Sequence, residues 1–452
     1  GFLVFGFTDY RVCVYALMLI FPFSATQFMP RQLLGITGLN PFNMLLGLAL
    51  VSFTLKRAFS RGELHSVPSI KPFVPMALAL AAGTLIGMGS VSKIPLFFHL
   101  LSTTLFETAA QYTRDVLIKP MLVFAYVWMV ACAVRDSKNV DRWVTGAIVS
   151  TVVLVLFILM YIARSGVSLA ALASADSRTF MDPTGLHSNE LGVIFLPGFA
   201  AALFAFRTAQ SQGKRILMIF LGGIILIGIA LTFSRAAFLA TTLLVVGFMI
   251  LQRQLIWILI GAFLLTSAVL FAPDSVKDRA TTGFSQGQVG GRSDPLTAGR
   301  VREIWMPLLP DLKRNAVLGG GVHATYWTDA ALNGSIAVGH PHNAYLRLIL
   351  DHGLVFGSLV VWSLVMMWKR VRACSQDETL SPYVRGFMQG VGLAALAFLV
   401  QCMSGARLVL DEQHSVYLTT IGIALGLAPM AKEAVDPKKA VRRFFRRRSL
   451  GR

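Results

Sequence analysis

The sequence predicts an all-α polytopic integral membrane protein with about twelve transmembrane helices and one large, partly helical loop outside the membrane. Two observations predict this class. Of the 452 residues, 55% are hydrophobic and only 14% are charged, whereas a soluble domain carries about 25% charged residues. The hydrophobic residues also form long runs, and a membrane-spanning helix needs about 20 of them. Because the runs are continuous and do not alternate, helices are favoured over a β-barrel.

The hydrophobic runs give the predicted elements in order along the chain. Spans are expected at about 8–28, 40–56, 72–91, 116–134, 143–163, 190–207, 215–232, 236–252, 254–272, 353–369, 386–404 and 414–431. The chain then divides into four parts: spans with short connectors in 1–272, a long polar loop in 273–352, the last spans in 353–431, and a basic tail in 432–452. No cleavable signal peptide is expected at its start.

Basic residues predict the orientation in the membrane. The net charge is +19, and alternate connectors, which lie on one side in a twelve-span arrangement, hold Lys56, Arg57 and Arg61; Arg135 and Lys138; Arg207, Lys214 and Arg215; Arg253; and Lys369, Arg370 and Arg372. By the positive-inside rule this side is cytoplasmic, so both termini are predicted there and the long loop on the opposite face. The basic tail could be a nucleic-acid arm, but beside a last span it fits better as an anchor on anionic membrane lipids, so no nucleic-acid partner is expected.

Cysteines and histidines bear on metal binding. The four cysteines, Cys13, Cys132, Cys374 and Cys402, lie in or beside spans and have no metal-ligand spacing, so neither a disulfide scaffold nor a zinc site is predicted. Three histidines, His340, His342 and His352, keep a metal site open as an alternative. The first two are only two residues apart, the third follows a predicted helix, and no carboxylate cluster is near in sequence. We therefore expect no metal and no cofactor.

Arginines on the outer side are candidate ligands for an anion. Arg235 lies between two spans, where a buried guanidinium is costly unless it is paired or binds an anion. Its planar fork suits a phosphate, although simple extension to the membrane surface is the alternative. Arg300 and Arg302 open an amphipathic helix whose apolar stripe is Val301, Ile304, Trp305, Leu308, Leu309 and Leu312, with a kink expected at Pro307 or Pro310. Cations gain nothing from a helix N-terminus, which favours an anionic ligand there over a solvated face.

The end of the loop holds a candidate base. His342 and Asn343 begin a predicted helix over 344–351, which Gly353 can end or bend. The helix dipole disfavours a protonated histidine at this position, so His342 can accept a proton near neutral pH. Arg347 and Asp351 have the spacing of an intrahelical ion pair. The preceding Gly319–Gly321 has no Lys-Ser/Thr after it, so we expect a flexible turn and not a phosphate loop.

Two smaller polar clusters complete the outer side. His187 and Asn189 precede the sixth span, and Arg407 precedes the last span together with Asp411, Glu412 and His414. Each cluster could contact substrate, and plain interface decoration is the alternative for both.

In order and sidedness these residues resemble the superfamily of O-antigen ligases and O-antigen polymerases of bacterial envelopes. The resemblance rests on an asparagine motif before a middle span, a Ser-Arg turn, a Gly-Arg before a Trp, a glycine turn and a His-Asn pair before a helix and a Gly. They match His187–Glu190, Ser234-Arg235, Gly299-Arg300 with Trp305, Leu318–Gly321, and His342-Asn343 with Gly353. One residue more than usual precedes Trp305, so Arg302 competes with Arg300. Phe356 stands where the family often has a small residue.

The resemblance implies transfer of a glycan from undecaprenyl diphosphate to a lipid A-core sugar hydroxyl at the periplasmic face of the bacterial inner membrane. It implies a metal-independent, inverting reaction, with His342 as base and Arg235 and Arg300 or Arg302 as diphosphate ligands. His340, Asn343, His187, Asn189 and Arg407 are possible substrate contacts. An O-antigen or exopolysaccharide polymerase is the alternative, although the single dominant late loop favours a ligase. Ligation to protein also stays open. A secondary transporter is less compatible, because the charges gather at the outer face and no internal repeat is found.

Overall fold

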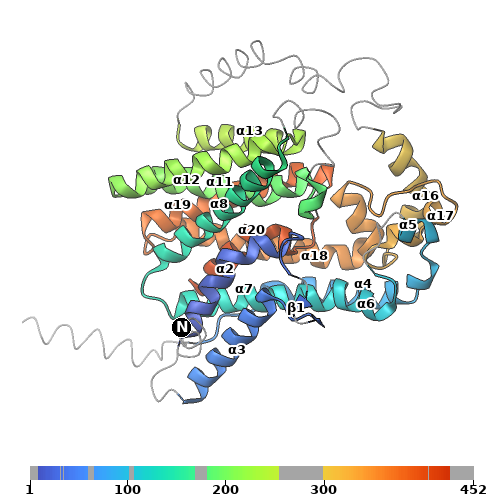
Figure 1. Cartoon of the computed structure of the whole chain (residues 1–452), viewed down its shortest axis with the longest axis horizontal. Coiled ribbons are helices and arrows are strands. Elements are labelled where there is room, and N and C mark those ends of the chain that lie inside the picture. The colour runs from blue at the N-terminus through green and yellow to red at the C-terminus, as the bar shows by residue number, and fades with distance from the viewer. Residues whose placement is uncertain are drawn as a thin grey trace, which may run out of the picture.

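The structure is a computed structural model and describes residues 9–30, 32–33, 35–59, 66–100, 106–167, 181–253, 299–405 and 407–427. Within these ranges the chain is almost entirely helical (Figure 1). The strands found there are β1 (Gln32–Leu33) and β2 (Ile36–Thr37), which pair as a small antiparallel hairpin. The predicted helical class is therefore confirmed. The predicted span 254–272, the loop residues 273–298 and the tail 432–452 lie outside the described residues.

Eight helical stretches in the described part are long and apolar enough to cross a membrane. They are α3 (Pro41–Phe59), Lys71–Met88, Ala109–Arg135, α8 (Val140–Ser165), α11 (Ser188–Thr208), α12 (Gln212–Leu231), α18 (Ala344–Gln376) and Pro382–Ser404. Three of these stretches combine shorter elements: η1 (Lys71–Phe73) with α4 (Val74–Met88); α6 (Ala109–Thr113) with η3 (Arg114–Ile118) and α7 (Lys119–Arg135); and α19 (Pro382–Gln401) with η7 (Cys402–Ser404).

Three shorter helices, together with the predicted span 254–272 outside the described residues, account for the difference from the predicted count. α2 (Tyr10–Ser24) and α13 (Arg235–Leu251) are apolar but below span length, and α20 (Ser415–Gly426) has 12 residues. The prediction of twelve spans is therefore not confirmed. The remaining elements are short: η2 (Val91–Lys93), α5 (Leu96–Leu100), η4 (Asp182–Thr184), η5 (Val301–Trp305), α16 (Met306–Arg314), η6 (Ala324–Trp327), α17 (Asp329–Leu332) and η8 (Glu412–His414).

α11 forms the centre of the helical bundle. It packs against α8, α12, α13 and α19, and most of its side chains from Leu191 to Ala205 are buried. By contrast, α12 leaves large apolar side chains such as Ile219 and Phe220 exposed along one face. Such a surface suits lipid, because in a bilayer apolar side chains do not need to be covered by protein.

Three of the basic connectors, those after α3, α7 and α18, meet at one end of the bundle. Lys56 lies 3.7 Å from Asp136, so the connectors after α3 and α7 adjoin. Arg370, near the end of α18, donates to the carbonyl of Ala424 at 3.0 Å, and Arg135 donates to that of Gly426 at 3.2 Å. The elements of the late polar region, α16 and α17, lie together with α5 at the other end (Figure 1). These contacts bring together the connectors after α3, α7 and α18, and a shared side for all the basic connectors stays a prediction.

Gly353 divides α18 into two segments. Its backbone has φ 61° and ψ −170°, which interrupts the helix, and this region of φ favours glycine. The N–H groups of Leu354 and Val355 donate to the carbonyls of Ala316 and Val317, at 2.7 and 3.0 Å. The predicted bend is confirmed, and it gives the first segment, which follows His342, its own direction.

The glycine turn at 319–321 closes against this first segment of α18. Gly320 and Gly321 donate their N–H groups to the carbonyls of Leu350 and Asp351, at 2.8 and 3.1 Å. These N–H groups are therefore used within the fold, which agrees with the prediction of a turn without a phosphate loop.

The predicted amphipathic helix begins as the π-helical η5 and continues as α16. Pro307 and Pro310 both lie inside this continuous stretch, where each removes one N–H from the helical hydrogen bonds. Ile304, Leu308 and Leu312 of the predicted stripe are buried, but Leu309 is exposed. The buried stripe is therefore narrower than predicted.

Candidate active site

The segment that ends the polar loop holds His342 in an uncommon backbone conformation. The φ of His342 is 52°, in the left-handed region, which costs a non-glycine residue free energy and needs support from its surroundings. Part of that support comes from Trp305, whose Nε1 donates to the carbonyl of Pro341 at 2.8 Å. The rings of His340 and His342 lie 4.1 Å apart between centroids. The η5 segment, which follows Arg300, is thereby joined to the two histidines.

Asn343 caps the helix that follows His342. Its Oδ1 accepts hydrogen bonds from the N–H groups of Tyr345 and Leu346, at 3.0 and 3.2 Å. This is the usual role of an asparagine at a helix start. The helix therefore begins where predicted, and His342 precedes the cap by one residue.

The imidazole of His342 faces the chain just after α19. A Cβ built on Gly405 would lie 3.7 Å from Nδ1 of His342 and 3.9 Å from Nδ2 of Asn189. The φ of Gly405 is 125°, which a residue with a side chain rarely adopts. Gly405 therefore brings the backbone against His342 and Asn189 without filling the space between them.

Asn189 joins three segments through its side-chain amide. Its Oδ1 accepts a hydrogen bond from the hydroxyl of Ser234 at 2.6 Å, and its Nδ2 donates to the carbonyl of Ser404 at 3.0 Å. Ser234 also caps α13, since its Oγ accepts from the N–H of Ala237 at 3.2 Å. The first residue of α13 is Arg235, so this network fixes where the Arg235 side chain starts.

His187 and Glu190 form a reciprocal cap at the start of α11. Nδ1 of His187 accepts from the N–H of Asn189 at 3.3 Å, and the N–H of His187 donates to Oε2 of Glu190 at 2.9 Å. The other oxygen of Glu190 accepts from Nε2 of Gln413 at 2.6 Å. The polar cluster before α11 and the one before α20 therefore meet, although more than 200 residues separate them (Glu190 and Gln413 are 223 apart).

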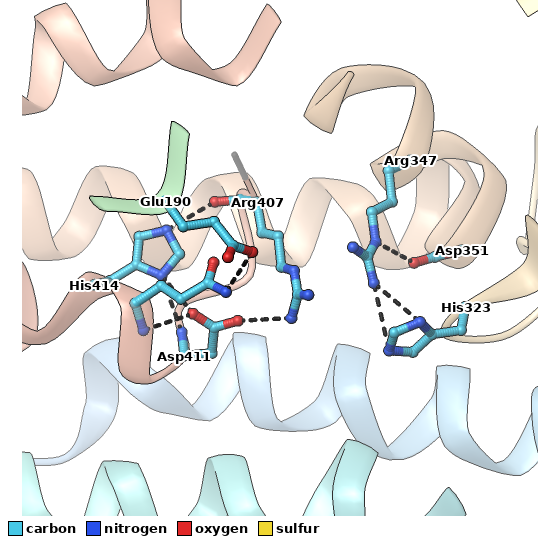
Figure 2. Close-up of polar contacts among 8 residues, drawn as sticks. Glu190, His323, Arg347, Asp351, Arg407, Asp411 and His414 are labelled. Atoms are coloured by element: carbon cyan, nitrogen blue, oxygen red, sulfur yellow. Dashed lines mark hydrogen bonds and ion pairs between the residues drawn. The ribbon is translucent and has the colours of Figure 1, made fainter. Parts of the chain in front are cut away.

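Arg407, Asp411 and His414 form one partly buried ion-pair cluster (Figure 2). Asp411 lies 2.9 Å from Nη1 of Arg407 and 2.9 Å from Nδ1 of His414. Burial alone would raise the pKa of Asp411, but the Arg407 charge and hydrogen bonds from His414 and Gln413 hold it below its usual value. Burial and the neighbouring Asp411 charge raise the pKa of Glu412. The cluster thus keeps one carboxylate ionised and makes the next one harder to ionise.

A second ion pair faces this cluster. On α18, Nε of Arg347 donates to Oδ2 of Asp351 at 3.2 Å, as the helical spacing predicted. Its Nη2 lies 3.3 Å from Nδ1 of His323. Figure 2 shows the guanidinium groups of Arg347 and Arg407 directed toward the same space. Burial, followed by these two charges, lowers the pKa of His323 well below its usual value.

Two pockets are associated with these groups. The first, which we call the histidine pocket, has a volume of about 490 Å³ and is lined by His187, Glu190, His340 and His342 among others. Burial lowers the pKa of His340 well below its usual value, with the charges of His342, Arg347 and Arg407 acting in the same direction. The second, the arginine cavity, has a volume of about 600 Å³ and includes Arg347 and Arg407. His352 lines the arginine cavity and not the histidine pocket.

The predicted site residues are therefore brought together in part. His187, His340 and His342 share the histidine pocket, Asn189 adjoins it, and Arg407 lines the arginine cavity. Arg235 is half-buried at the start of α13. Arg300 is half-buried at the start of η5, whereas Arg302 is exposed. Among the residues that the structure describes, no three His, Cys, Asp or Glu side chains are grouped closely enough to hold a metal ion.

Sequence reasoning missed two members of the arginine cavity. His323 gave no sequence signal, because its partner Arg347 is 24 residues away. Arg347 was assigned only an ion pair with Asp351, and nothing in the helical spacing shows that the pair borders a cavity. The neighbouring glycines at 319–321 were the nearest usable signal, since they mark the turn that carries His323.

Comparison with known proteins identifies a domain in the second half of the chain. Residues 218–361 match the family model described as O-antigen ligase. This range contains Arg235, Arg300 and His342, but neither the cluster before α11 nor Arg407. A search of curated proteins gives no match to the chain. The match covers residues 218–361 and supports the predicted resemblance to the superfamily of O-antigen ligases and O-antigen polymerases.

Proposed function

We propose that this chain transfers a glycan from undecaprenyl diphosphate to a hydroxyl of a lipid A-core sugar, at the periplasmic face of the bacterial inner membrane. Members of the superfamily are glycosyltransferase-like enzymes of O-antigen pathways. The observation that carries the proposal is the convergence of three segments at His342. Asn189 links the surroundings of His342 to the helix that starts at Arg235. Trp305 links the backbone beside His342 to the segment that starts at Arg300.

His342 is the proposed general base. It takes the proton of the acceptor hydroxyl while that oxygen attacks the anomeric carbon of the donor sugar. A new glycosidic C–O bond forms, and the bond from the anomeric carbon to the diphosphate breaks, with its electron pair leaving on the diphosphate. Direct displacement inverts the anomeric configuration. The proton on His342 then passes to solvent.

Arg235 and Arg300 are the proposed diphosphate ligands. Negative charge grows on the departing oxygens, and fixed guanidinium groups stabilise it most effectively where water is excluded. Of the two arginines before Trp305, we assign this role to Arg300, because it is half-buried while Arg302 is exposed. His187 and His340 line the histidine pocket and are the proposed contacts to the sugar.

The proposed orientation rests on the basic connectors. Those after α3, α7 and α18 meet at one end of the bundle, and the positive-inside rule assigns such an end to the cytoplasm. The late polar region lies at the other end (Figure 1), which supports a periplasmic site.

Reconstituted transfer tests the proposal. The full chain in lipid vesicles is supplied with undecaprenyl-diphosphate-linked O-antigen and lipid A-core, and products are separated by size. Glycan joined to lipid A-core supports a ligase. Longer chains on undecaprenyl diphosphate, formed also without lipid A-core, would instead identify a polymerase. Absence of both products from wild-type protein that has kept its fold would refute glycan transfer, and His342→Ala supplies the inactive control.

A further inference from the structure

The arginine cavity has no role in the transfer proposed above, yet it adjoins the site. Gln413 lines this cavity, Glu190 lines the histidine pocket, and the 2.6 Å hydrogen bond between them forms part of the boundary. Arg347 follows His342 by little more than one helical turn. A molecule that fills the arginine cavity would therefore end close to the histidine pocket.

Both arginines of the cavity have N–H groups that donate to no acceptor within the described chain. Arg347 uses Nε on Asp351 and Nη2 on His323, and Arg407 uses Nη1 on Asp411. Within the described chain, Nη1 of Arg347 and Nε and Nη2 of Arg407 donate to no protein acceptor, and none of them is sealed from solvent. The Arg347 side chain itself is only 12% exposed. A buried guanidinium with spare, accessible N–H groups is arranged to hold an acceptor from outside the protein.

The charges around these donors are nearly balanced. Asp351 neutralises Arg347 and Asp411 neutralises Arg407. Farther along the lining, Arg114 and Lys119 share Asp115, at 3.1 and 2.8 Å. A dianionic or more highly charged ligand needs excess positive charge, and the cavity offers little. It offers fixed donors beside fixed carboxylate acceptors, which is what a group that both donates and accepts requires.

We propose that the arginine cavity binds a saccharide through its hydroxyl groups, as a subsite beside His342. Each sugar hydroxyl can accept from a guanidinium N–H and donate to Asp351, Asp411 or Glu412. The cavity volume of about 600 Å³ falls within the range of about 300–1,000 Å³ found for small-molecule sites. This inference rests on the proposed glycan transfer, because only then are two saccharides expected at this face. Either the acceptor or the donor glycan could supply the sugar.

Binding measurements test the subsite without requiring transfer. Isothermal titration of the full chain in nanodiscs uses three probes: oligosaccharide released from lipid A-core by mild acid, oligosaccharide released from the lipid-linked donor, and inorganic diphosphate. The variants are Arg347→Lys and Arg407→Lys, which keep the charge beside each carboxylate and remove the spare guanidinium donors. Arg372→Lys, an exposed position near the end of α18, is the matched control.

We expect each cavity variant to weaken the binding of one oligosaccharide by about tenfold, the scale of a lost hydrogen bond to a charged donor. Binding of diphosphate should not change, and the control variant should bind all three probes as the wild type does. If the oligosaccharide from lipid A-core binds more weakly, the acceptor supplies the sugar in this cavity. If the oligosaccharide from the lipid-linked donor binds more weakly, the donor supplies it. Val409→Phe, which fills part of the cavity without touching its charges, should give the same loss and covers the case in which a lysine variant does not fold. Loss of diphosphate binding with both oligosaccharides unaffected, or no change with any probe, would overturn the subsite. Because wild-type binding is measured directly, a chain that binds the sugar but transfers nothing would refute the proposed function alone.

Discussion

The hydroxyl of Ser234 donates a 2.6 Å hydrogen bond to Oδ1 of Asn189 and so fixes the start of α13 against the start of α11. The other end of the same amide donates to the carbonyl of Ser404 at 3.0 Å. Both polar atoms of the Asn189 side chain therefore bind neighbouring segments of the site. The sequence suggested Asn189 as a substrate contact, but these hydrogen bonds favour a positioning role.

Asn189→Ala should therefore lower kcat more than it raises KM for either substrate. Arg235 and His342 would lose their fixed relation, and misplacement of reacting groups costs about ten- to hundredfold in rate. Ser234→Ala should give a similar defect, and the double variant should lose less than the sum of the two single effects, because both remove the same hydrogen bond. The check is kcat and KM for donor and acceptor in the three variants. Strictly additive effects would show that the bond does not couple the segments.

Much of the fold could be predicted from hydrophobic runs, because each apolar helix corresponds to one continuous run of hydrophobic residues in the sequence. Every predicted span except 254–272, which is outside the described residues, has a helix in the structure, and the bend at Gly353 came from residue type alone. The number of membrane spans was harder to predict, since α2, α13 and α20 are shorter than a full span although their hydrophobic runs resemble those of the longer helices.

The site was predictable only where a local pattern carried it. His342 with Asn343, and Arg347 with Asp351, are neighbours in sequence or on one helix. The arginine cavity depends on long-range packing, which brings Arg407 and Arg347 to the same space from different segments (Figure 2). No periodicity or spacing contains that information.

Acid should weaken the Arg407–Asp411 cluster. The pKa of Asp411 is lowered in the folded chain, so its contribution to stability is present above the usual aspartate pKa and is lost as the pH falls through the folded value. Wild-type protein should therefore lose thermal stability as the pH is lowered from about 5 towards 3. Asp411→Asn should be less stable at pH 7 and should change less over that range. Melting temperatures of both proteins across the range provide the check, and equal pH slopes would contradict it.

Activity should survive removal of divalent metal. The proposed leaving-group stabilisation comes from Arg235 and Arg300, whose charge needs no metal. Transfer by the purified chain should be unchanged after EDTA treatment, within about a factor of two of the untreated rate. Loss of activity that magnesium or manganese restores would refute the arginine-only mechanism. It would also bring back the metal alternative for His340 and His342.

His342 should be accessible from the periplasm. The native cysteines Cys13, Cys132, Cys374 and Cys402 are all buried, so replacing them with serine or alanine gives a background for His342→Cys. An impermeant thiol reagent should label this protein in cells whose outer membrane alone is permeabilised. Labelling that requires disruption of the inner membrane would reverse the proposed orientation. A cysteine at Arg372, near the basic end of the bundle, should show the opposite pattern.

The division of labour between base and diphosphate ligand gives the last prediction. His342→Ala should abolish transfer but leave binding of the lipid-linked diphosphate nearly intact, because the imidazole is not needed to hold the anion. Arg235→Ala should instead weaken that binding by about ten- to hundredfold, as expected for loss of a charge-assisted hydrogen bond. Arg235→Lys should rescue it only in part, since lysine keeps the charge but not the fork.

Donor binding and single-turnover transfer must be measured on the same preparations, after each variant is shown to reach the membrane folded. Arg302→Ala serves as the matched control, because Arg302 is exposed where Arg300 is half-buried, and it should keep both activities. If His342→Ala loses donor affinity as severely as Arg235→Ala, His342 is part of the diphosphate site and another group must take the acceptor proton. His340 would then be the first candidate, because it shares the histidine pocket and its ring lies 4.1 Å from that of His342.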